Sequence, residues 1–157
     1  SDVYKRQAQE RSIRQTRQLY QAEGEIEKFV ALAEHVSSLQ DSAECNSEDE
    51  AKAEAKAAYV EHLKTLAGGC TLPPDGTDTD VEFCTFTLTR ANDAVRIETK
   101  LKMELKYKVK KIEKQEPQPG GTFKEVIKYT AKVSKAAHSY STYTITHLTA
   151  EKGGTSE

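Results

Sequence analysis

The 157-residue chain has no tryptophan, one methionine and four prolines, and it has no apolar run of membrane-spanning length. A bilayer-spanning helix needs about 18 or more consecutive apolar residues, so we expect no membrane span in this sequence. No short apolar segment follows a basic start, as it would in a signal peptide. Hydrophobic residues make up 36% of the chain and charged residues 31%. The expected core is therefore small, and much of the chain must lie in water.

Signatures of catalysis and of metal binding are also missing. The three cysteines form no C-x-x-C, and no two of the four histidines share a helical turn, so zinc and thioredoxin-type chemistry have no support. There is no G-x-S-x-G motif, and the glycines of "PGGTFK" lack the spacing of a phosphate-binding loop. We therefore expect no catalytic residue, no metal ligand and no cofactor. An enzyme is the less favoured class, although one sequence does not exclude it.

The cysteines permit one disulfide. If residues 47–67 form a helix about 30 Å long, Cys45 and Cys70 lie at its opposite ends and cannot meet. The remaining choice is a bridge between Cys70 and Cys84, which would form only in an oxidising compartment. The alternative is that all three cysteines are reduced thiols.

The second half of the chain has the pattern of β-structure. In "VRIETKLKMELKYKVKK" the apolar residues alternate with charged ones, which is typical of a strand with one buried face. Neighbouring segments are rich in β-branched and aromatic residues. Short connections at 91–93, 115–121 and 136–139 predict a four-stranded antiparallel meander. The strands are expected at residues 81–90, 95–111, 122–135 and 140–150.

The first half predicts an antiparallel helical hairpin. Apolar residues recur at helical spacing over 12–39, and an Ala-rich stretch over 47–67 predicts a second helix. A sheet with one apolar face needs a cover, so the expected fold is α+β, with the hairpin packed on the meander. The expected organisation along the chain is a non-native or disordered start (1–11), the hairpin (12–69), an acidic loop (70–80), the sheet (81–150) and a flexible tail (151–157), with 12–150 as a single domain.

The start of the chain limits any prediction of localisation. The opening "SDVYKRQ" is similar to translated sequencing-adapter read-through, so we expect residues 1–7 not to be native. If the start is otherwise complete, the protein is expected in the cytoplasm. If an upstream segment is missing, an exported or anchored protein is expected.

Lysines dominate the outer face of the predicted sheet. Residues 90–135 carry 13 Lys/Arg against 6 Asp/Glu, whereas residues 1–69 carry 9 against 13. Such a face could bind nucleic acid or another polyanion. The alternatives are a solvated face that prevents edge-to-edge aggregation, and attraction between the two halves of the chain. The candidate residues for an anionic partner are Lys100, Lys102, Lys106, Lys108, Lys110, Lys124, Lys128 and Lys132.

The last predicted strand is a second candidate site. Its two faces are nearly equal in polarity, so its register is weakly specified. At the edge of the sheet it could accept a strand from another chain. The residues of this candidate strand-pairing edge are Tyr140, Thr142, Thr144 and Thr146. The first helix is a third candidate, because its early turns carry few apolar residues.

These features favour a non-enzymatic binding or assembly module that acts through the first helix, the lysine-rich face or the last strand. A protein partner or a second copy is the expected partner, with a polyanion as the other choice. One alternative is an exported structural subunit, since a long helix before an antiparallel sheet resembles the layout of pilin-like proteins. Their N-terminal processing motif and apolar helix are not present here. Another alternative is a small-ligand carrier or enzyme with a pocket between helices and sheet.

Overall fold

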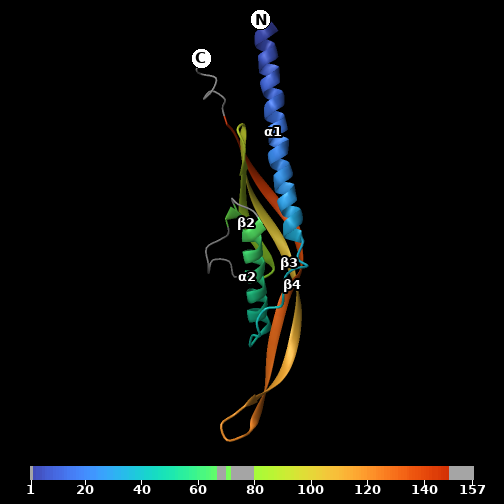
Figure 1. The fold of residues 1–157 in the computed structure, drawn as a ribbon, viewed down its shortest axis with the longest axis vertical. Helices are drawn as coiled ribbons and strands as arrows, with labels where there is room; N and C mark the ends of the chain where they lie inside the picture. Colours follow the sequence, from blue (N-terminus) through green and yellow to red (C-terminus); the bar gives the residue numbers. More distant parts are fainter. Residues whose placement is uncertain (1, 67–69, 72–79, 149–157) are drawn as a thin grey trace.

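The computed structural model describes residues 2–66, 70–71 and 80–148, and it has an α+β fold with two helices on an antiparallel sheet (Figure 1). The helices are α1, Asp2–Glu34, and α2, Glu48–Leu66. The long strands are β2, Phe83–Ala91, β3, Val95–Pro117, and β4, Phe123–His147. A two-residue strand, β1, Cys70–Thr71, pairs with the outer edge of β2. The strand order is β1-β2-β3-β4, and every neighbouring pair is antiparallel.

The predicted third and fourth long strands are one continuous strand, so the four-stranded meander is wrong in this respect. The turn expected at residues 136–139 lies inside β4, which pairs with β3 along its whole length. Together β3 and β4 form a hairpin that extends beyond α2 (Figure 1). Gly120 and Gly121 close it with φ values of 94° and 85°, which residues with a side chain rarely adopt.

Two β-bulges explain why the sequence suggested a turn. The register of β4 against β3 shifts between Lys102 and Met103 and again between Lys106 and Tyr107. At these points Ser139 and Ser134 are skipped in the residue pairing with β3. Each extra residue reverses which side chains face the core. The apolar alternation is therefore broken twice within six residues, which is also the pattern of a strand that ends.

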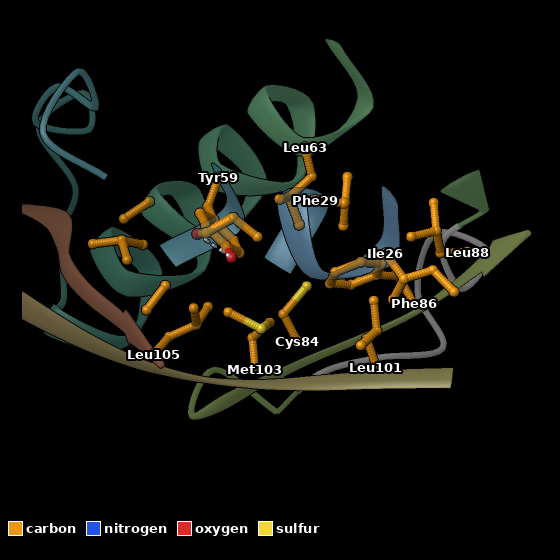
Figure 2. Close-up of a cluster of buried hydrophobic side chains, with 14 of the residues drawn as sticks. Ile26, Phe29, Tyr59, Leu63, Cys84, Phe86, Leu88, Leu101, Met103 and Leu105 are labelled. Atoms are coloured by element: carbon orange, nitrogen blue, oxygen red, sulfur yellow. Dashed lines mark hydrogen bonds between the residues drawn. The ribbon is translucent and has the colours of Figure 1, made fainter. Parts of the chain in front are cut away.

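The two helices cover one face of the sheet, and the core lies between the two layers (Figure 2). The predicted alternation of β3 is present, because Val95, Ile97, Leu101 and Met103 are fully buried while the charged residues between and beside them are exposed or, at Lys102, partly buried. Phe29 of α1 meets Phe86 of β2 edge to face, with ring centroids 5.4 Å apart. This aromatic contact helps to pack α1 against the sheet.

The helices pack on the sheet more than on each other, which differs from the expected helical hairpin. Each helix makes most of its contacts with strands. The direct link between them includes the buried Tyr59, whose hydroxyl donates a hydrogen bond to the carbonyl oxygen of Ala33 at 2.9 Å. Ser47 caps α2 by accepting a hydrogen bond from the backbone N–H of Glu50.

The first helix starts earlier than predicted and extends past the sheet (Figure 1). Residues 2–11, expected to be non-native or disordered, belong to α1, and residues 2–14 are all exposed. Gln18 links α1 to the sheet, because its carbonyl oxygen accepts a hydrogen bond from the Asn92 side chain at 2.8 Å. The side-chain oxygen of Asn92 also accepts bonds from the backbone N–H groups of Ala94 and Val95. This residue therefore shapes the β2–β3 turn and holds α1 to it.

Candidate anion-binding face

The register places the predicted lysines on the face of the sheet that the helices leave uncovered. The even-numbered residues of β3 face away from the core, and Lys124, Lys128 and Lys132 of β4 stand opposite Glu116, Ile112 and Lys108. Most of these lysines are exposed, while Lys102, Lys128 and Lys132 are partly buried. The eight residues therefore share one face, but they do not share one environment.

Two lysines of β3, between the middle of the face and the hairpin end, have acidic partners. Lys110 forms an ion pair with Asp41 at 3.0 Å, and Lys114 forms one with Glu44. Both carboxylates belong to the connection between α1 and α2, which runs along β4 through backbone hydrogen bonds between Cys45 and Tyr129. These two lysines are therefore paired with acidic residues from the first half of the chain.

Lys128 and Lys102 are also engaged. The Lys128 ammonium donates a hydrogen bond to the Asn46 side chain at 2.6 Å and lies 3.8 Å from Glu116. The Lys102 ammonium lies 4.1 Å from the ring centroid of Phe83 and 5.5 Å from that of Tyr140. These are cation–π distances. The position of Phe83 on this face was not predicted from the sequence.

Four lysines in the middle of the face stand in two directly opposed pairs. Lys106 is opposite Lys135, and Lys108 is opposite Lys132, across the β3–β4 ladder. We call these four residues the lysine quartet. Opposed Cβ atoms in an antiparallel ladder are about 5 Å apart, and like charges in such pairs are destabilising. Within residues 2–66, 70–71 and 80–148, no ion pair or hydrogen bond of the four ammonium groups is found.

Lys135 is the member of the quartet that the sequence analysis missed. In an unbroken strand that buries Val133, Lys135 would face the core. The bulge at Ser134 reverses the alternation, so Lys135 turns outward and Ala136 is buried instead, 3% exposed. Since the pattern of one strand does not show where a bulge lies, only the pairing with β3 reveals this residue.

The cysteines show no reactive site in the described part of the chain. Cys45 is buried, and burial raises the pKa of its thiol, with the carboxylates of Glu54 and Glu50 adding to the effect. β1 pairs Cys70 with Leu88, about 13 Å along β2 from Cys84 at 3.3 Å per residue. The side chain of Cys70 lies outside the described residues. The Cys70–Cys84 bridge therefore stays a prediction, and it would require a different pairing of this short strand.

The proposed strand-pairing residues Tyr140, Thr142, Thr144 and Thr146 are exposed and lie at the C-terminal end of β4.

A hollow of about 390 Å³ lies between α1 and the β2–β3 turn. Its lining includes Glu25 and Lys28, and Glu25 lies 3.7 Å from Arg90. Among the described side chains, no group of three or more His, Cys, Asp or Glu is arranged to hold a metal ion. Nor does the described chain contain a helix long and apolar enough to cross a membrane.

The chain has no match among protein-family models, among curated proteins or among solved structures.

Proposed function

We propose that the protein is a non-enzymatic binding module that holds a polyanion on the helix-free face of its sheet. The observation that carries this proposal is the lysine quartet, Lys106, Lys108, Lys132 and Lys135. Its like charges are directly opposed and have no acidic partner among the described residues.

The contrast with neighbouring lysines on the same strand supports the proposal. Lys110 and Lys114 meet the carboxylates of Asp41 and Glu44, so their charge is balanced within the chain. Two neighbouring like-charged pairs lower the stability of the ladder. A partner that brings negative charge to this position would relieve the repulsion and gain four ammonium contacts.

The chemistry of the quartet favours recognition of charge. Lysine is a compact, flexible point charge, whereas arginine offers the fixed fork that reads planar or bidentate groups. The stacking platforms that hold single-stranded bases combine such charge with exposed aromatic rings. Here the rings of Phe83 and Tyr140 flank Lys102 and not the quartet. Binding should therefore depend on charge density and little on sequence.

The test is the binding of heparin and of oligothymidylate as a function of salt. Four contacts to a single strand predict that log K falls with log salt with a slope of about −2.8. The variant Lys106→Gln/Lys108→Gln should bind much more weakly, with a slope reduced by about 1.4. The matched control Lys110→Gln/Lys114→Gln removes the same charge from the same strand and should bind nearly as wild type.

Three results would contradict the proposal. They are absence of binding at low salt, binding that does not depend on salt, and equal losses in the two double variants. The last result would show that net charge, and not the quartet, determines the affinity.

A further inference from the structure

The C-terminal part of β4, residues 138–147, is unusually open for a strand. Apart from Ser141, every residue in it is exposed, although the opposing β3 residues from Val95 to Met103 alternate into the core. Tyr143 and Ile145 share the core-facing side of the ladder but are 52% and 42% exposed. The side chains on both faces of this segment are therefore largely open to solvent, including those on the side where the helices lie.

The outer edge of the same segment is also open. In the N-terminal half of β4, the connection between the helices covers the edge at Tyr129 and Ala131 by backbone hydrogen bonds. At the start of the open segment, the Glu34 carboxylate accepts a hydrogen bond from the backbone N–H of His138. Among the described residues, the backbone groups of residues 140–147 form hydrogen bonds only with β3. Alternate N–H and C=O groups there point away from the sheet.

This edge lacks the features that normally prevent pairing with another chain. Exposed edge strands in monomers usually carry charges, proline or bulges. The segment "HSYSTYTITH" has no Lys, Arg, Asp, Glu or Pro, in a chain that is 31% charged. Its bulge at Ser139 lies at one end and leaves the rest of the segment in regular register with β3.

We propose that the protein forms a two-fold dimer in which residues 140–147 of β4 pair antiparallel with the same segment of a second copy. A second copy fits because the segment is free of charge, so self-pairing brings no like charges together. Hydroxyl and aromatic side chains then face one another across the new ladder, and such cross-strand pairs are favourable. Because each subunit uses its single open β4 edge, this interface closes and does not propagate.

Sedimentation equilibrium of the full chain over a range of concentrations tests the proposal. Wild type should reach a dimer and nothing larger. Thr144→Lys should weaken dimerisation about tenfold or more, because it places a charge at the shared edge. The new lysine stands opposite Glu98 of its own sheet, so the fold should tolerate it.

The chain offers a matched control for this variant. Thr89 of β2 is also opposite Glu98, on its other side. Thr89→Lys adds the same charge beside the same carboxylate, but away from the β4 edge, and it should dimerise as wild type. Hydrogen exchange of wild type provides a second measurement, since protection of residues 140–147 should increase with protein concentration.

The proposal is overturned if wild type stays monomeric, if it forms larger assemblies, if the exchange of this segment does not depend on concentration, or if both lysine variants dissociate equally. The Lys106→Gln/Lys108→Gln variant should remain a dimer, which separates this inference from polyanion binding.

Discussion

Replacing Tyr59 by phenylalanine tests how α1 and α2 are joined. The Tyr59 hydroxyl is fully buried and donates to the Ala33 carbonyl oxygen. That carbonyl belongs to the last turn of α1, where the helix itself supplies no donor. Tyr59→Phe keeps the ring and leaves a buried acceptor unsatisfied. We expect the free energy of unfolding to fall by about 1–2 kcal/mol at pH 7.

The same residue makes a prediction about alkaline pH. Burial raises the pKa of Tyr59 well above its ordinary value of 10.0, and the nearby acidic groups of Cys84 and Glu34 add to the shift. Above about pH 10 the unfolded chain releases this proton while the native state keeps it. The stability that Tyr59 contributes is therefore complete below pH 10 and decreases as the pH rises toward the folded pKa. The loss is about 1.4 kcal/mol by pH 11.

Urea unfolding of wild type and Tyr59→Phe at pH 8 and pH 11 measures both effects. The difference between the two proteins should shrink toward zero at pH 11, because the variant has no proton to lose at this position. Comparing the two proteins cancels the titration of the other tyrosines and lysines. Tyr20→Phe, at a 66% exposed position, should match wild type at both pH values. A difference that stays constant from pH 8 to pH 11 would refute the burial of Tyr59 beneath α1.

Two further changes test β4 and the quartet. Deleting Ser139 should lower the free energy of unfolding by less than about 1 kcal/mol, because this residue has no partner on β3 and its removal preserves every pair. Deleting the buried, paired Ala131 should lower the free energy of unfolding by about 2 kcal/mol or more in the same urea experiment, because it forces a register slip. Similar losses of stability in the two deletion variants would indicate a turn at 136–139. Lys106→Glu should raise the melting temperature by pairing with Lys135 while weakening heparin binding, and a lowered melting temperature would argue against repulsion in the quartet.

The elements with an unbroken pattern could be predicted from the sequence. In β3 each buried residue alternates with a charged one as far as Leu105, so the strand and its buried face follow from period two alone. The position of α2 follows from the cap at Ser47 and from the small and apolar residues on one side. In both elements the local preference and the burial agree, which is the condition under which a sequence pattern is reliable.

The elements that differed from prediction have no such agreement. The early turns of α1 bury nothing, so no apolar stripe marks where the helix begins. The continuity of β4 depends on Ser134 and Ser139, which break the alternation without ending the strand. Lys135 joined the quartet through the first of these bulges. Bulges are a property of a strand and its partner together, so a pattern read along one strand could not locate them.

The two proposed surfaces lie on one sheet, and their geometry links them. Antiparallel pairing of β4 with its own copy requires a two-fold axis perpendicular to the sheet, because each strand must reverse its direction while keeping its faces. The helix-free faces of both subunits then lie on the same side of one continuous sheet. Each lysine quartet has its counterpart on that side, so a long polyanion could contact both. Binding to two quartets at once raises the affinity for the polyanion, although each subunit makes the same contacts as it would alone.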